Sequence, residues 1–158
     1  TASGLRVVVL PDKYAADTRD MVLAEAEGAL EVMAPFVVAR TDGASGGAAL
    51  SIPEGAGKGI GRAALRMVVP AAGRYVVFAR VLWSDGCGNS IALRMGDREI
   101  HLADDLYGRW HQVEGATPLE LPAGELMVEV LNLEDGVMLD FVGLRLAAAK
   151  TADAPPAE

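Results

Sequence analysis

Three carboxylates in this sequence stand where their charges need a partner. Glu25 and Glu27 lie in an apolar run, and in an extended strand they would face the same side about 7 Å apart, where like charges repel. Asp140 alternates in phase with Val142 and Leu144, so it is expected to point to the apolar side of the last strand. A hard cation such as Ca²⁺, which takes roughly six to eight oxygen ligands, would neutralise such a group. The alternative is that the glutamates are solvated and that Asp140 caps a turn.

The other reactive side chains form no recognisable catalytic motif. His101 and His111 are the two histidines, and neither stands beside a nucleophile or within a metalloprotease motif. The single cysteine, Cys87, has no neighbour in sequence that would stabilise a thiolate. Residues 55–61 are glycine-rich but fit neither the dinucleotide nor the Walker spacing. A hydrolase or lyase would have to draw its acid and base from acidic turns, namely Asp104, Asp105, Glu134 and Asp135. Because acidic turns are expected in any chain of this charge, we predict that the protein is not an enzyme.

Short strands must position these side chains, because apolar residues recur mainly with period two. Runs of about five to ten residues are separated by Gly, Pro, Asp and Asn, which supply the backbone angles of tight turns. The predicted strands are 6–10, 21–26, 36–40, 48–52, 63–69, 73–83, 90–95, 99–102, 109–113, 119–121, 125–133 and 138–146. About twelve short strands at this spacing predict an all-β sandwich.

The composition limits the kinds of partner. The chain has 158 residues, of which 51% are hydrophobic, and this is enough apolar material for one domain with a sizeable core. Its formal net charge of −8 would repel phosphate, so we expect no nucleic-acid partner. No run approaches the roughly 20 apolar residues that cross a bilayer, so we expect no membrane insertion. Residues 148–158, rich in Ala, Pro and acidic side chains, are expected to be a disordered tail or a linker.

Several short motifs occur in an order that resembles a known family. They are Leu-Ala-Glu-Ala-Glu at 23–27, Ala-Ser-Gly-Gly at 44–47, Val-Pro-Ala-Ala-Gly-Arg-Tyr at 69–75 with Arg80, then Trp110, Leu-Pro-Ala-Gly at 121–124, Asp-Gly at 135–136 and Leu-Asp at 139–140. Together they resemble the carbohydrate-binding modules of families 6 and 35, which are galactose-binding-like jelly rolls. The resemblance places a jelly-roll β-sandwich at residues 21–147 and leaves residues 1–20, with the strand at 6–10, as an N-terminal extension.

The resemblance also implies a function and a metal. It implies a non-catalytic module that recognises a polysaccharide or another glycan in an extracellular or cell-surface setting. It implies a structural calcium ion held by Glu25, Glu27 and Asp140, with backbone carbonyls of residues 42–47 completing the ligand shell. These are the same three carboxylates whose charges need a partner.

The ligand site carried over from the family is built on aromatic side chains. Tyr107 matches the position of the family's platform residue, on which the face of a pyranose ring would stack. Trp110 matches a tryptophan that packs in the core. Trp83, with Asp85 and Asn89 in the loop that follows it, is expected to form another rim of the site.

One departure from the family leaves a second function open. The family often places a ligand-binding Asn shortly before the last-strand Asp, whereas this chain has Val137 and Met138 there, and neither side chain donates a hydrogen bond. The alternative is therefore a structural or protein-interaction sandwich of a cell-surface assembly that has lost sugar binding. Its protein partner would contact an exposed apolar edge or the strand at 6–10.

Overall fold

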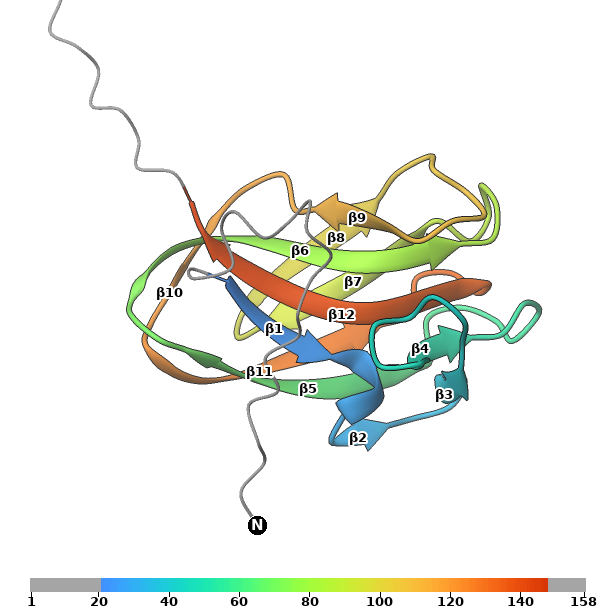
Figure 1. The fold of residues 1–158 in the computed structure, drawn as a ribbon, viewed down its shortest axis with the longest axis horizontal. Helices are drawn as coiled ribbons and strands as arrows, with labels where there is room; N and C mark the ends of the chain where they lie inside the picture. The colour runs from blue at the N-terminus through green and yellow to red at the C-terminus, as the bar shows by residue number, and fades with distance from the viewer. Residues whose placement is uncertain (1–20, 148–158) are drawn as a thin grey trace, which may run out of the picture.

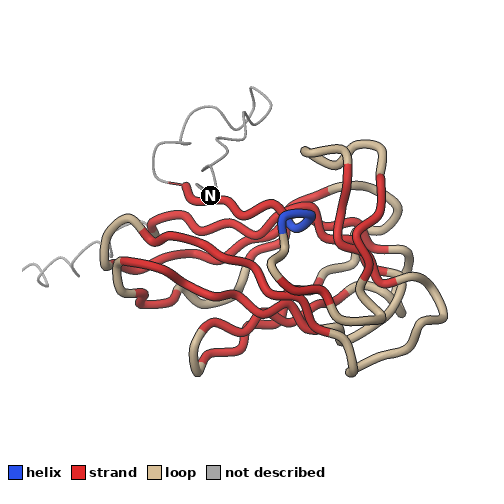
Figure 2. Tube along the Cα trace, turned by 90° about the horizontal axis from the view of Figure 1, so that it is seen from below, coloured by secondary structure: helices blue, strands red, loops and turns tan. Residues whose placement is uncertain are grey.

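The computed structural model describes residues 21–147, which form two antiparallel β-sheets packed face to face (Figures 1 and 2). One turn of 3-10 helix, η2 (Ala26–Gly28), follows the first strand. The strands are β1 (Met21–Glu25), β2 (Glu31–Val32), β3 (Val37–Arg40), β4 (Ala48–Ile52), β5 (Arg62–Val69), β6 (Gly73–Trp83), β7 (Ser90–Met95), β8 (Arg98–Ala103), β9 (His111–Glu114), β10 (Leu119–Leu121), β11 (Gly124–Leu131) and β12 (Val137–Leu146). The predicted all-β sandwich is confirmed.

The long strands β6 and β12 form the centre of the first sheet (Figure 1). This sheet has the order β10-β6-β12-β4-β3, with β9 beside β6 and β1 beside β12. The second sheet has the order β2-β5-β11-β7-β8. Two strands share one edge of β12, because β4 pairs with residues 137–139 and β1 pairs with residues 141–145. Asp140 lies at the junction between these two partners.

A β-bulge interrupts β12 at the same residue. Leu139 pairs with Val81 of β6 and Phe141 pairs with Arg80, so Asp140 is the extra residue between two consecutive pairs. The bulge changes the phase of the strand: Leu139 before it and Val142 after it both belong to the core between the sheets. Asp140 is buried, as expected, but its simple alternation with the residues that follow is not what buries it, because the strand does not keep one period through this point.

The core forms where the inward faces of the two sheets meet. Alternate residues of β6 are buried at 0 or 1% exposure, and those of β5 at 2% or less. Removing one such large apolar side chain from water contributes roughly 1.5–3 kcal/mol, which explains why the period-two pattern determines the fold. These alternating residues are Tyr75, Val77, Ala79, Val81 and Trp83 in β6 and Ala63, Leu65, Met67 and Val69 in β5.

Four predicted strands have the bounds that the structure shows. The strands at 48–52, 73–83, 90–95 and 119–121 have the predicted bounds. Gly96 adopts φ +63° in the tight turn between β7 and β8, as a turn at that position requires. Strand β2 was not predicted, because two exposed residues show no alternation.

Two sequence predictions fall on other parts of the chain. The strand at 6–10 and the tail at 148–158 lie outside the described residues. Within residues 21–147, no helix has the length and apolar character needed to cross a membrane.

Candidate functional site

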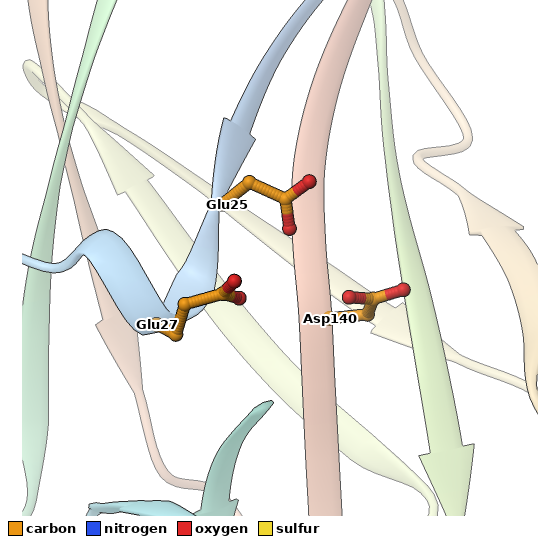
Figure 3. Close-up of side chains that lie close together, drawn as sticks. All are labelled: Glu25, Glu27 and Asp140. Carbon is orange, nitrogen blue, oxygen red and sulfur yellow. The ribbon is translucent and has the colours of Figure 1, made fainter. Parts of the chain in front are cut away.

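Glu25, Glu27 and Asp140 come together where β1 ends beside β12 (Figure 3). One carboxylate oxygen from each lies within 4.8 Å of the others. Glu25 is the last residue of β1, Glu27 lies in η2, and Asp140 occupies the bulge of β12. The prediction that both glutamates share one strand face is wrong, because the chain leaves the strand after Glu25. The tight 3-10 turn brings the two carboxylates together instead.

A second backbone segment closes over these carboxylates at Ser45. The Ser45 N–H donates to both oxygens of Asp140, at 2.9 and 3.1 Å. The Ser45 hydroxyl lies 2.7 Å from Asp140 Oδ1 and 2.7 and 2.9 Å from the two oxygens of Glu25. A hydroxyl carries one hydrogen, so it cannot donate to both carboxylates at once. The group therefore contains more acceptor oxygens than donors.

Among residues 21–147, one positive side chain, Arg80, reaches the group. Its Nη1 lies 2.5 Å from Asp140 Oδ2 and donates to the Gly43 carbonyl at 2.8 Å. The Asp140 side chain is 0% exposed and that of Arg80 is 27% exposed, so removing Arg80 would leave a buried charge without a partner. With all three carboxylates ionised, one guanidinium leaves the group with two negative charges.

The electrostatics agree with this excess of negative charge. The pKa of Glu25 is raised above its ordinary value, chiefly because burial disfavours the charged form. The hydrogen bond from Ser45 lowers this pKa, whereas the charges of Glu27 and Asp140 raise it. Ionising the whole group therefore costs free energy when no cation is present.

The oxygen atoms of this acidic group are suitable ligands for a metal ion. Glu27 Oε2 is buried and has no hydrogen-bond partner in the described part of the chain. The backbone of Gly46 lies so close that a Cβ there would be 1.7 Å from Glu27 Oε1. The carboxylates supply only oxygen, which is the ligand that hard cations prefer. Glu25, Glu27 and Asp140 could therefore hold a metal ion.

Trp110 lies beside this acidic group and not in the core. Its side chain is partly exposed, its Nε1 donates to the Asp42 carbonyl at 3.1 Å, and the Arg80 guanidinium lies 5.1 Å from its ring centroid. The expected core position is wrong, because Trp110 precedes β9 and follows no strand alternation. Of the backbone carbonyls expected to complete a calcium shell, those of Asp42 and Gly43 already accept bonds from Trp110 and Arg80.

Tyr107 lies at the surface and is held at both ends. The residue is 42% exposed. Its backbone forms an isolated parallel bridge with Trp83, and the neighbouring Gly108 N–H donates to the Trp83 carbonyl at 2.9 Å. Its hydroxyl donates to Asp105 Oδ1 at 2.8 Å, and this bond is the main reason that the pKa of Tyr107 is raised. The phenol therefore stays protonated and its ring has a fixed orientation.

The loop between β6 and β7 lies beside Tyr107. A Cβ on Gly86 would be 3.4 Å from the Tyr107 hydroxyl. Asn89, at the end of this loop, donates from Nδ2 to the Asp104 carbonyl at 2.9 Å. Asp85 is exposed in the same loop. The structure thus places Tyr107 beside the loop that carries Asp85 and Asn89.

Trp83 does not lie at the surface with Tyr107, Asp85 and Asn89. It is 0% exposed, its Nε1 donates to Asp104 Oδ1 at 2.9 Å, and its ring packs edge-on against His111 at 6.1 Å. The predicted rim position is corrected, because Trp83 shares the inward phase of β6 with Val81 and is part of the core. A sugar cannot stack on this ring.

Sequence reasoning missed the roles of three residues. Asp104 accepts bonds from Trp83 and His111, so its carboxylate anchors a loop. Arg80 had a signal, since it is the single charged residue between positions 75 and 83 of an otherwise apolar strand. The closing role of Ser45 gave no signal, because it depends on a contact 95 residues away in the chain.

Comparisons with known proteins show likeness in structure only. No protein-family model and no curated protein matches this chain. A β-(1,4)-mannanase of Podospora anserina with a family 35 module is similar at a TM-score of 0.67 and 16% identity, over 87% of this chain and 29% of that enzyme. A module of the Cellvibrio mixtus lichenase 5A, solved with cellotriose, is similar at a TM-score of 0.63 and 16% identity. The match covers 80% of this chain and 97% of that module. A family 35 module of Clostridium thermocellum is similar at a TM-score of 0.63 and 12% identity, and the match covers 80% of this chain and 98% of that module.

The coverage identifies what is shared. The chain matches almost the full length of the two isolated modules but less than a third of the mannanase. At sequence identities of 12–16%, the structural similarity establishes the fold alone. The chain therefore has the jelly-roll β-sandwich fold of carbohydrate-binding modules of families 6 and 35.

Proposed function

We propose that this chain is a non-catalytic, glycan-binding module with a structural calcium ion, working outside the cell or at its surface. The observation that carries the proposal is Tyr107, an exposed and oriented aromatic ring on a fold shared with carbohydrate-binding modules. The module of the Cellvibrio mixtus lichenase, which was solved with cellotriose, supports a glycan as the ligand class.

Tyr107 would be the platform for a sugar ring. The electron-rich ring face attracts the CH groups of a pyranose, which carry a small positive charge. The hydroxyl bond to Asp105 and the backbone bridge to Trp83 orient the ring before a ligand arrives, so little conformational freedom is lost on binding. The polar groups of Asp85 and Asn89 in the adjacent loop would bond the sugar hydroxyls and set its orientation.

Glu25, Glu27 and Asp140 would hold the calcium ion. Their three charges less that of Arg80 leave −2, which one divalent ion neutralises. When bound, the ion supplies the positive charge that the group lacks. Because Glu25 ends β1 and Asp140 interrupts β12, the role would be to fix two neighbouring strands and the segment around Ser45.

Isothermal titration calorimetry with soluble β-glucans, β-1,4-mannan and β-1,3-galactan tests the glycan site. We expect enthalpy-driven binding to at least one of them, weakened about tenfold or more by Tyr107→Ala, because the stacking surface is lost. Leu106→Ala is the matched control, since Leu106 is 41% exposed on the same segment and should leave the affinity unchanged. Wild-type protein that binds none of the glycans would overturn the sugar site.

The alternative, a protein-interaction sandwich, is favoured by one exposed apolar edge. Strands β2 and β3 end the two sheets, and the stretch that contains them exposes Leu30 by 64%, Met33 by 42% and Val38 by 46%. An open edge with apolar side chains can accept an added strand from a partner. If the protein binds none of the glycans and a protein partner that binds this edge is recovered, the alternative replaces the sugar-binding proposal.

A further inference from the structure

Trp110 connects the two proposed sites through a short stretch of chain. It lies three residues after Tyr107, and its Nε1 donates to the Asp42 carbonyl at 3.1 Å. Three residues beyond Asp42, Ser45 closes over Asp140. The segment that carries the proposed sugar platform is therefore hydrogen-bonded to the segment that covers the acidic group.

Arg80 strengthens this link from the sheet. Its guanidinium contacts Asp140 and the Gly43 carbonyl and lies over the Trp110 ring, 5.1 Å from the centroid. Gly43 packs directly on that ring, where a Cβ would be 2.9 Å from Trp110 Cδ1, and its φ of +82° favours glycine. Trp110, Gly43, Arg80 and Asp140 thus form one continuous set of direct contacts.

The same stretch of chain is also anchored on the Tyr107 side. The Leu106 N–H donates to Asp104 Oδ1 at 3.1 Å, and the Gly108 N–H donates to the Trp83 carbonyl at 2.9 Å. Residues 104–110 are therefore fixed at one end on the core and at the other, through Trp110, on the acidic group. The two amides report whether the Tyr107 segment is ordered.

We propose that Trp110 and Arg80 are positioning residues that couple occupancy of the acidic group to the order of residues 104–110, so that cation and sugar bind cooperatively. This inference rests on the proposed function. Arg80 and Ser45 now share the Asp140 oxygens that a cation would also use, so both must readjust when the group is filled. Arg80 lies over the Trp110 ring, and Ser45 follows Asp42 and Gly43, which contact that ring. Because linkage is reciprocal, the sugar would tighten the cation by the same factor as the cation tightens the sugar.

Hydrogen exchange of the full chain in CaCl₂ and in EGTA tests the coupling with the metal alone. In wild type we expect Ca²⁺ to slow exchange of the Leu106 and Gly108 amides about fivefold and to change tryptophan fluorescence. The Gly115 amide, which donates to the Val77 carbonyl at 2.8 Å, is the internal reference and should not respond. In Trp110→Leu we expect Ca²⁺ affinity about tenfold weaker, from one lost hydrogen bond and one lost cation–π contact, and no response of either amide at saturation.

Two further variants separate positioning from general packing. Trp110→Phe keeps a ring for Arg80 but lacks the Nε1 donor, so it should retain part of the amide response. Leu106→Ala alters the same segment without touching the link and should respond as wild type does.

Each contrary outcome overturns a different statement. Calcium binding with unchanged amides in wild type overturns the coupling and leaves the proposed function standing. A wild-type response in Trp110→Leu overturns the role of Trp110. Absence of calcium binding by calorimetry overturns both the metal site and the coupling, whereas the sugar site is still decided by Tyr107→Ala.

Discussion

Glu27 is the residue that shows most clearly how the acidic group destabilises the metal-free fold. Its Oε2 is buried and finds no hydrogen-bond donor within residues 21–147, while its charge lies close to those of Glu25 and Asp140. A buried acceptor without a partner costs about 1–3 kcal/mol, and the neighbouring carboxylates add repulsion. Such a residue is unfavourable for a metal-free fold and useful as a cation ligand.

Replacing this charge should therefore separate stability from metal binding. For Glu27→Gln we expect the free energy of unfolding in EGTA to rise by about 1 kcal/mol, because the repulsion is removed and the amide can donate to a neighbouring carboxylate. Calcium affinity should fall in the same variant. Urea unfolding in EGTA and calcium titration measure the two effects.

Glu31→Gln is the matched control for that variant. The Glu31 side chain is 56% exposed and lies 3.7 Å from Arg62, so its exposed ion pair should change stability by less than about 0.5 kcal/mol. Lower stability of Glu27→Gln in EGTA, together with unchanged calcium affinity, would contradict the proposed role of Glu27.

The predictability of single residues depended on whether a strand pattern reached them. Trp83 was wrongly predicted to form a rim, although the strand pattern indicates its burial, because it continues the inward phase of Tyr75 and Val81. The strand pattern does not indicate the position of Trp110, since it stands one residue before β9 begins, where no alternation applies. The three carboxylates were identified because each carried a charge in an apolar setting.

At the scale of elements, the bulge in β12 positions the acidic group. Asp140 lies between the β4 and β1 partners of one strand edge, and the bulge turns its carboxylate toward Ser45 and Arg80. The period-two pattern predicted β12 to within one residue. It could not predict the bulge, because Leu139 and Val142 are both apolar and the sequence does not show where the strand changes phase. Likewise, the pattern could not predict that the chain leaves β1 for a 3-10 turn at Ala26.

The loop that carries Asp85 and Asn89 depends on close packing between two connections. A Cβ on Gly88 would be 2.4 Å from the Asp135 carbonyl oxygen and 3.2 Å from that of Gly136, and neither backbone atom can move alone. For Gly88→Ala we expect a loss of about 2 kcal/mol or more in the free energy of unfolding, measured by urea denaturation. Glycan affinity should fall with it.

Gly28→Ala provides the comparison for that substitution. No heavy atom lies within 4 Å of a Cβ built there, so stability should change by less than about 0.5 kcal/mol. Equal stability of the two variants would show that the β6–β7 loop is not held in the way described.

At the scale of the whole molecule, the sandwich places the two proposed sites, which differ in chemistry, at the two ends of one connecting segment. The acidic group lies where β1, β12 and the Ser45 segment meet, and Tyr107 lies on the connection between β8 and β9. Trp110 belongs to that same connection. With 12–16% identity to modules of the same fold, the shared architecture depends on the alternation of core residues more than on particular side chains.

Calorimetric unfolding of the full chain in EGTA, in Ca²⁺ and in Ca²⁺ with each glycan tests the central claim most directly. At about one hundred times Kd, calcium should stabilise the fold by about 2.7 kcal/mol and raise Tm by several degrees, and Asp140→Asn should abolish the rise. One glycan should raise Tm further in wild type and not in Tyr107→Ala. A Tm that responds to neither calcium nor any glycan would contradict the account of this chain as a calcium-stabilised, sugar-binding module.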